Sequence, residues 1–347
     1  MPTIHLTDRT PVARARPATR ALTQAAITAQ RAPSIFNSQP WLWNIHDELA
    51  ELRADRERQL PVVDPEGRML ILSCGVALHH ACVALAGTGA VPLVTRLPAE
   101  ADPDLLAILT VADVTAPAPA AVRFQQAIAL RRTDRRPFAD EPVPEPALDR
   151  LRDAAEQHGA HLHVLRPADV VLLTVAASHA AEAELADPAY RTELGAWTRP
   201  SAGNGDGVPG DGVPVDTAGP TGRRRVPVRD FAPDAADRPV IADVADRHAR
   251  YAVLFTDGDD PASWLAAGEA LSAVLLTATA DRLATSPMTD VIEVPAARRT
   301  LYDLLGHTGH PMVALRVGIP GDRARPAPAT PRLTGRDLLG AAEGALP

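Results

Sequence analysis

The chain has 347 residues and a mass of 36.7 kDa, which is too long for one ordinary hydrophobic core and suggests roughly two units. All 35 basic residues are arginine, so lysine Schiff-base chemistry, pyridoxal phosphate enzymes and a P-loop lysine are excluded, although a GC-rich genome would also explain the bias. The formal net charge of -8 argues against nucleic acid or an anionic membrane as the main partner.

Hydrophobic periodicity predicts helices and strands that are mixed without a regular alternation. In chain order the predicted elements are a helix at 18–30, strands at 41–45 and 49–52, a helix at 71–85, a strand at 106–111, a helix at 146–157, strands at 161–165 and 251–255, a helix at 264–278 and a strand at 312–317. No Gly-x-Gly-x-x-Gly motif follows a strand, which disfavours a Rossmann domain. We therefore expect an α+β fold.

The two long predicted helices share one pattern. Six apolar positions of the helix at 71–85 remain apolar when 193 is added to their numbers, and Gly75 falls on Gly268. The strand that follows is shifted by 206, from 106 to 312, so the later connection is 13 residues longer (206 minus 193). Two unrelated amphipathic helices would explain part of this match. The alternative is two related α/β halves, about 1–120 and 121–347, packed as a dimer within one chain.

Residues 201–222 differ in composition from the rest of the chain. They are rich in Gly, Pro and Asp and contain Gly-Asp-Gly-Val-Pro twice, starting at Gly205 and Gly210. Such a segment is poor in side chains that could form a core, so we expect a mobile excursion that serves as a lid or a decoration. The ligand spacing of a calcium loop is absent, and we expect no metal.

Two polar motifs indicate chemistry. The first, Ala32-Pro-Ser-Ile-Phe-Asn-Ser-Gln-Pro-Trp41, has two prolines that exclude a helix and leave backbone amides free for the edge of a planar heterocycle. A capped connection from helix to strand is the simpler alternative. The second, Arg131-Arg-Thr-Asp-Arg-Arg-Pro-Phe138, offers guanidinium groups that match phosphate oxygens two at a time. The alternative for this second motif is a run of arginines that are simply exposed to solvent. Asp134 could also pair with a neighbouring arginine and use up its charge.

Together the motifs resemble those of the nitroreductase family. Residues 32–41 are similar to its A-P-S-x-x-N-x-Q-P-W turn, and Arg131–Arg135 to its R-x-[ST]-x-[RK] flavin phosphate motif. Ordinary members have the arginine motif first and bind FMN between two subunits. Here the order is reversed, with about 94 residues from Asn37 to Arg131 (131 minus 37). This order resembles the Acg-type branch, in which two nitroreductase halves are fused into an intramolecular pseudo-dimer.

The resemblance implies a set of cofactor contacts. They are Pro33, Ser34, Ile35 and Asn37 for the flavin ring and ribityl chain, Arg131, Arg132 and Thr133 for phosphate and ribityl oxygens, Arg135 for the pyrimidine edge, Arg332 as the closing phosphate arginine, and Ser286 and Pro287 in the loop near flavin N5. The second half has 159–163 where its own turn should stand. We therefore expect one FMN per chain and a monomer that acts as its own dimer.

These features predict an FMN-dependent oxidoreductase that passes two electrons from NAD(P)H to a flat acceptor such as a nitroaromatic or a quinone. We expect no catalytic side chain, because the flavin carries the chemistry. The alternatives are a protein that stores FMN or senses with it under a covered flavin, and a structural protein that has lost the cofactor. No apolar run reaches about 18 residues, and residues 1–17 lack the apolar core of a signal peptide, so we expect a cytoplasmic protein without a membrane partner.

Overall fold

The computed structural model describes residues 17–198, 205–209, 226–227, 229, 231, 247–321 and 327–334. In the first part of the chain the elements are α1 (Pro17–Ala29), η1 (Ile35–Asn37), β1 (Trp41–His46), β2 (Leu49–Ala54), η2 (Arg56–Arg58), α2 (Arg68–Gly87), β3 (Ala90–Arg96), β4 (Leu105–Val114) and α3 (Pro119–Leu130). In the second part they are α4 (Glu145–Glu156), β5 (His161–Val164), α5 (Val170–Ala186), α6 (Pro188–Trp197), β6 (Arg250–Thr256), α7 (Pro261–Ala280), β7 (Ala284–Met288), α8 (Asp290–Glu293), α9 (Pro295–Leu304) and β8 (His310–Gly318).

The strands form two antiparallel sheets with the same topology. One sheet has the order β1-β2-β4-β3 and the other the order β5-β6-β8-β7. Their registers also coincide, since Val94 pairs with Leu109 in one sheet and Pro287 pairs with Leu315 in the other. These partners differ by 193 and 206 residues, the two shifts that the sequence shows. The expected α+β fold of two related halves is confirmed.

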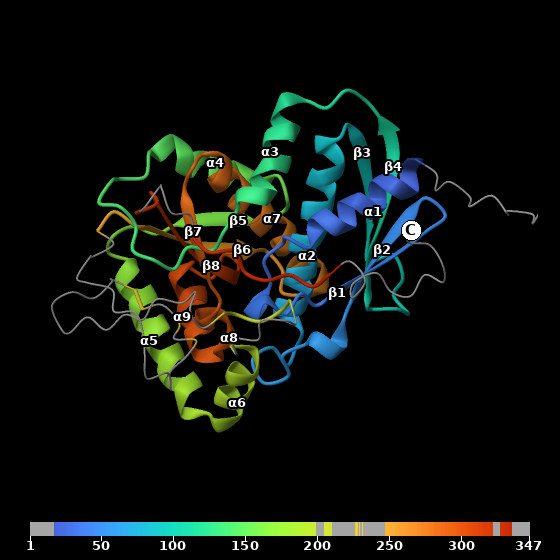
Figure 1. Ribbon diagram of the computed structural model, residues 1–347. Coiled ribbons are helices and arrows are strands. Elements are labelled where there is room, and N and C mark those ends of the chain that lie inside the picture. Colours follow the sequence, from blue (N-terminus) through green and yellow to red (C-terminus); the bar gives the residue numbers. More distant parts are fainter. Residues whose placement is uncertain are drawn as a thin grey trace, which may run out of the picture.

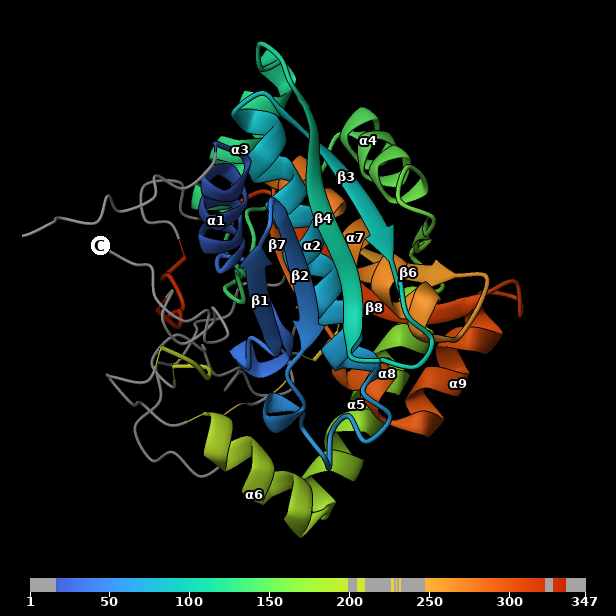
Figure 2. The same ribbon diagram turned by 90° about the vertical axis from the view of Figure 1, so that its right-hand side faces the viewer.

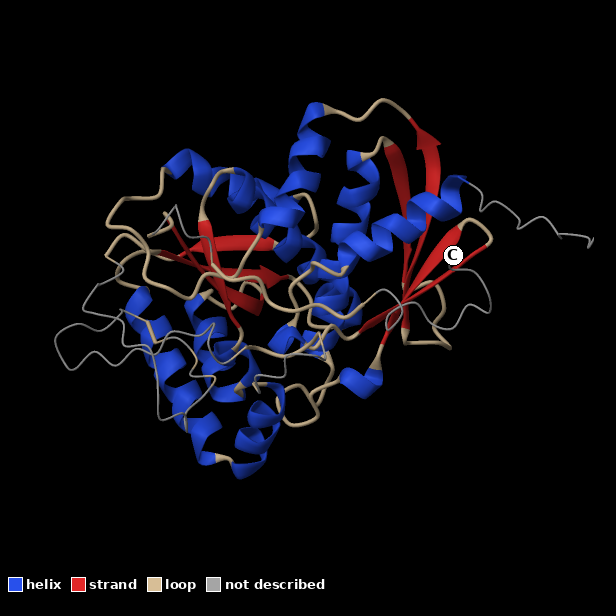
Figure 3. Ribbon diagram, viewed as in Figure 1, coloured by secondary structure: helices blue, strands red, loops and turns tan. Residues whose placement is uncertain are grey.

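The long helices α2 and α7 lie between the two sheets and form the largest helix contact of the molecule (Figures 1 and 3). Their axes approach closely because glycines meet at the crossing. A Cβ on Gly75 would lie 2.2 Å from the Leu265 carbonyl oxygen, and one on Gly268 would lie 2.0 Å from that of Leu72. Farther along, the Nδ1 atom of His79 lies 2.7 Å from the Ser272 hydroxyl. The shift of 193 turns Gly75 into Gly268, Leu72 into Leu265 and His79 into Ser272, so the contacts are reciprocal and the halves pack about a pseudo-twofold axis.

The halves differ in the connection that leads into their first strand. In the first half α1 packs on α2 and residues 30–40 lead to β1, whereas in the second half α4 packs on α7 and only residues 157–160 lead to β5. The first half therefore has room for a shaped turn and the second half does not. Figure 2 shows the sheet of the first half, with α2 behind the strands and α1 beside the edge formed by β1.

Each element predicted from periodicity is present, but the edge strands β3 and β7 and the helices α3, α5, α6, α8 and α9 were not predicted. Ser286 and Pro287, expected in a loop, lie within β7, and a proline is tolerated there because an edge strand has one unpaired side. Helices α2 and α7 are long and apolar enough to span a membrane, yet 78% and 72% of these spans are buried inside the fold. Their apolar character is explained by the core they build.

Candidate functional site

The turn at residues 30–40 has a backbone conformation that only tertiary contacts can hold. Phe36, Asn37 and Gln39 have φ angles of 47°, 55° and 52°, in the left-handed region that favours glycine. Within the turn, the Ser34 hydroxyl accepts the backbone N–H of Gln39 at 2.9 Å. Hydrogen bonds inside the turn and to the second half of the chain stabilise these unfavourable φ angles.

Two motif side chains tie the turn to the second half of the chain. The Asn37 amide donates to the carbonyl oxygens of Gly207 and Pro331, both at 3.0 Å, and its Oδ1 accepts from Arg332 at 2.6 Å. The Gln39 side chain makes the same kind of link, to Gly205 and Leu333. Asn37, expected on the flavin, thus holds the arginine that was expected on the phosphate. Of the predicted excursion 201–222, only 205–209 is described, and that piece contacts the turn; the rest lies outside the described residues.

The arginine motif follows α3 and lies against β7. The Asp134 backbone N–H donates to the Thr285 carbonyl oxygen at 2.9 Å, next to a bridge between Thr133 and Thr285. Asp134 does pair with an arginine, but its partner is Arg136, at 2.7 Å. The first arginines of the motif are therefore not neutralised by this carboxylate.

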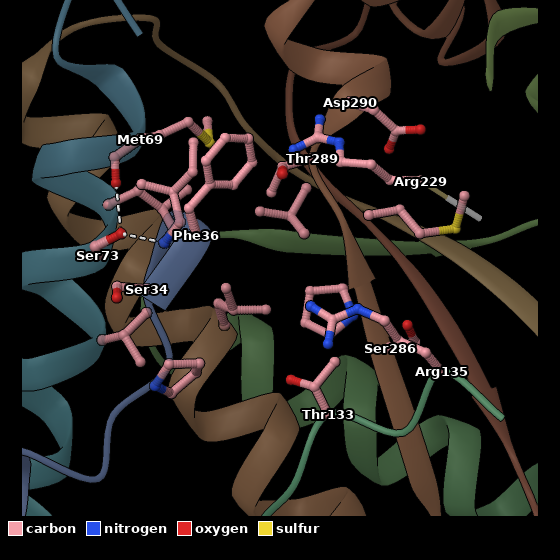
Figure 4. A pocket seen from close by; sticks show the side chains of 18 of the residues that line it. Ser34, Phe36, Met69, Ser73, Thr133, Arg135, Arg229, Ser286, Thr289 and Asp290 are labelled. Carbon is pink, nitrogen blue, oxygen red and sulfur yellow. Dashed lines mark hydrogen bonds between the residues drawn. The ribbon is translucent and has the colours of Figure 1, made fainter. Parts of the chain in front are cut away.

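Two connected chambers lie between the turn and the arginine motif, and both are lined by Thr133 and Arg135. The inner chamber has a volume of about 90 Å³ (Figure 4) and is lined by Pro33, Ser34, Ile35, Phe36, Met69, Leu72, Ser73, Val76, Thr133, Arg135, Arg229, Phe231, Leu271, Ser286, Pro287, Met288, Thr289, Asp290 and Val313. The arginine chamber has about 690 Å³, and its charged lining is Arg31, Arg131, Arg132, Arg135 and Arg332. All the residues expected at the cofactor line these chambers, except Asn37.

The arginine chamber is a positive site, and Arg131 is its buried member. Arg131 is 4% exposed, its Nε and Nη1 atoms have no hydrogen-bond partner among the described residues, and no described carboxylate lines the chamber. Burial, together with the charges of Arg332 and Arg132, lowers the pKa of Arg131 to about 9. Burial also lowers the pKa of Arg332 to about 10, with Arg132 and Arg31 adding to the effect. A buried cation without an anion is costly, so the chamber is built for an anionic group.

Arg135 occupies the junction of the chambers. Its guanidinium lies 4.7 Å from the centre of the Phe231 ring, and burial lowers its pKa to about 10, helped by Arg229 and Arg316. Figure 4 shows Thr133, Arg135 and Ser286 on one side of the inner chamber and Ser34, Phe36 and Ser73 on the other. The chamber is thus formed by both halves of the chain, as the reversed motif order predicts.

Sequence reasoning missed the upper wall of the inner chamber. Arg229 donates to Glu184 of α5 at 2.9 Å and to Glu293 of α8 at 2.6 Å, and its guanidinium lies 5.0 Å from the Phe36 ring centre. Phe36 and Phe231 meet edge to face at 5.8 Å between centroids. The sequence around Arg229 has no periodicity, and the two acids that bind Arg229 are 45 and 64 residues away. No local pattern therefore indicated that Arg229 belongs to this wall.

The pseudo-symmetric counterpart of this site is closed. Val76 and Thr289, which line the inner chamber, correspond by the shift of 193 to Glu269 and Arg96. Arg96 donates to both carboxylate oxygens of Glu269, at 2.6 and 2.7 Å, and Glu269 is 3% exposed. A bidentate ion pair therefore fills the position that the chamber occupies in the other half.

His80 and His307 lie in contacts with other protein groups. No group of three or more metal-ligating side chains occurs among the described residues. His80 is buried and its pKa is lowered to about 3, first by burial and then by Arg131. His307 stacks on Tyr302 at 4.9 Å between ring centroids and lies 2.9 Å from Asp303.

The two fused α+β halves enclose a cavity lined by arginines, and the sequence of the chain matches a known family. The model of the nitroreductase family matches residues 128–319. Two Mycobacterium tuberculosis H37Rv proteins named "Putative NAD(P)H nitroreductase" are similar: Rv3131, 39% identical over 88% of this chain and 86% of its own length, and acg, 33% identical over 90% and 93%. The chain belongs to the nitroreductase family.

Solved structures are also matched. An FMN-dependent nitroreductase from Mycobacterium smegmatis, NfnB in complex with NADPH, aligns with 65% of this chain and 100% of its own, at 16% identity and a TM-score of 0.39.

Proposed function

We propose that the protein is an FMN-dependent NAD(P)H oxidoreductase that binds one FMN per chain across the two chambers and works as a monomeric pseudo-dimer. The observation that carries this proposal is the arginine chamber, where the buried Arg131 and four further arginines line one cavity without a described carboxylate. A terminal phosphate supplies the charge and the oxygen acceptors that such a group requires. The turn on the opposite wall offers backbone groups to the ring, which meets the other requirement of the family's cofactor.

In this proposal the residues have distinct roles. Arg131 and Arg332 hold the phosphate, and Arg132 is partly engaged because its Nη1 donates to the carbonyl oxygens of Ala129 and Arg131. The ring lies in the inner chamber, with Pro33, Ser34 and Ile35 on one side and Ser286 and Pro287 on the other, as proposed from sequence. Arg135 stabilises negative charge at the pyrimidine edge, which favours uptake of electrons. FMN, when bound, supplies two-electron transfer between NAD(P)H and a flat acceptor such as a nitroaromatic or a quinone.

A binding ratio of one follows from the closed counterpart. The second half lacks a turn of its own, and the Arg96–Glu269 pair occupies the equivalent position. If Arg96 moved out to make room for a cofactor, Glu269 would remain buried and unpaired, which is unfavourable.

A second candidate function, storage of FMN or sensing with little turnover, is favoured by one observation. The inner chamber has only about 90 Å³, and Phe36 and Phe231 meet across it. If these side chains cover the outer face of the ring, a nicotinamide or an acceptor cannot stack on the flavin.

Anaerobic mixing separates the two candidates. The protein is saturated with FMN, mixed with NADPH or NADH, and followed by flavin absorbance. Rapid bleaching, followed by recovery on addition of a quinone, supports the oxidoreductase. Bound flavin that neither nucleotide bleaches supports the store, and a protein that takes up no FMN contradicts both.

A further inference from the structure

Three carboxyl groups gather around one guanidinium at the wall of the inner chamber. Glu184 from α5 and Glu293 from α8 both accept from Arg229, and Asp290 begins α8 next to them. All three acids are 5% exposed or less at the residue or side-chain level. We call these four residues the acid cluster.

The charges of the acid cluster do not balance. Three carboxylates against Arg229 would leave two negative charges in a desolvated place. Asp64, in the turn before α2, is close enough to Glu293 for their charges to repel. Tyr190 of α6 also faces the cluster and adds no positive charge. Buried acids of this kind keep a proton rather than ionise together. Burial raises the pKa of Asp290, with Glu293 adding and Arg229 opposing, and burial raises the pKa of Glu184 to about 7.

Asp290 is the acid of this cluster that reaches the inner chamber. It lines the chamber together with Ser286, Pro287 and Thr289, the stretch proposed to lie near the reactive part of the ring. Figure 4 shows Asp290 beside Arg229 and Thr289 at the top of the chamber. The cluster therefore stores a proton at the place where an acceptor would be reduced.

We propose that Asp290 is a catalytic acid, held protonated by the acid cluster, that gives its proton to the acceptor; this inference rests on the proposed function. A quinone that receives a hydride derived from NAD(P)H becomes a hydroquinone anion. The O–H bond of Asp290 then breaks, a new O–H bond forms on the quinone oxygen, and the neutral hydroquinone leaves. The Asp290 carboxylate takes a proton from water, so one quinone, one NAD(P)H and one proton give one hydroquinone and one NAD(P)+.

The test compares Asp290→Asn with Asp149→Asn, which removes an exposed carboxylate that pairs with Arg152 on α4. FMN-loaded protein is reduced anaerobically and mixed with a quinone between about pH 5.5 and 8.5. We expect the rate of flavin reoxidation in the native protein to fall as pH rises, and Asp290→Asn to be about a hundredfold slower at low pH with a flat profile. Asp149→Asn should keep the native rates of bleaching by NADPH and of reoxidation by the quinone, because its carboxylate is exposed on α4 away from the chamber. Asp290→Asn with the native rate and profile would overturn the proposal.

A second variant tests the cluster without removing its acid. Glu293→Gln deletes a negative charge beside Asp290, so Asp290 should ionise more readily and the falling limb should move to lower pH. A limb that stays in place or moves to higher pH would contradict the role of the cluster.

Infrared difference spectra provide a readout that needs no cofactor. The protein without FMN should show the carbonyl stretch of a protonated carboxylic acid at low pH, with reduced intensity in Asp290→Asn and not in Asp149→Asn. An unchanged band in Asp290→Asn would overturn the proposal. A failure to bind FMN is a separate result, which overturns the proposed function and leaves this band to report whether Asp290 holds a proton.

Discussion

Gly75 and Gly268 touch at the crossing of α2 and α7, and neither position has room for a side chain. A Cβ on Gly75 would lie 3.0 Å from the Gly268 Cα atom, and a Cβ on Gly268 would lie 2.8 Å from the Gly75 Cα atom. The contact is reciprocal, as it is in a symmetric dimer interface, although both residues belong to one chain. It sets the distance between the halves and so the width of the cavity between them.

The glycine crossing predicts a steric penalty. Gly75→Ala or Gly268→Ala should lower the free energy of unfolding by about 2 kcal/mol or more, because the new methyl meets a backbone carbonyl that cannot move alone. Gly195→Ala in α6 is the control, since nothing lies within 4 Å of its Cβ position, and it should be neutral or slightly stabilising. Denaturant unfolding measures both. Equal stability of Gly75→Ala and Gly195→Ala would contradict the close packing.

The arginine chamber predicts opposite effects on stability and binding. Arg131→Met removes a buried charge but keeps most of the side-chain volume, so the protein without FMN should unfold at the same or a higher temperature. Its FMN dissociation constant should rise between about tenfold and a hundredfold, the value of one charge-assisted bond. Arg191→Met, on the exposed face of α6, should change neither. Thermal unfolding and FMN titration test this pair, and undiminished affinity in Arg131→Met would refute the phosphate role.

The closed counterpart predicts coupling between two residues. Arg96→Thr leaves the buried Glu269 carboxylate unpaired and should cost about 2 kcal/mol, less than a fully buried pair because the Arg96 side chain is 48% exposed. Adding Glu269→Val, which installs the Val76 and Thr289 types of the open site, should recover at least half of that loss. A double-mutant cycle by denaturant unfolding measures the coupling. Additive losses would show that the pair does not act as a unit.

The acid cluster predicts how stability depends on pH. Burial raises the pKa of Glu184 to about 7 in the folded state, so between its unfolded value and this pKa the folded protein binds more protons. The contribution of Glu184 to stability is therefore fully present at low pH and is lost as pH rises from about 4.5 to 7. Glu184→Gln should flatten the fall in unfolding free energy across this window. Glu182→Gln, on the exposed face of the same helix, is the control and should keep the native dependence of unfolding free energy on pH. The same native dependence in Glu184→Gln would contradict the raised pKa of Glu184.

Much of the fold could be read from local patterns. The helices at 71–85 and 264–278 and the strands at 106–111 and 312–317 have strong periodicity, and their shared spacing reports a duplication because the glycine crossing constrains both copies. Strand β3 escaped prediction because Pro92 interrupts a short edge strand, next to a register shift between Val91 and Pro92.

The site could be predicted only where a motif carried it. The turn and the arginine motif line one cavity, as the resemblance implies. Asn37 was expected at the flavin but binds Gly207 and Pro331 instead. These partners are 170 and 294 residues away, and no local pattern links them to Asn37. Arg229 was missed for the same reason, because its meaning depends on Glu184 and Glu293 folding against it.

Titration of the protein with FMN under equilibrium conditions decides whether one composite site exists per chain. The visible spectrum of the bound flavin should saturate at one FMN per chain, on a species whose mass by light scattering is that of a single chain. Binding that saturates at two FMN per chain would contradict the closed counterpart formed by Arg96 and Glu269. The absence of any flavin uptake would contradict the cofactor site itself.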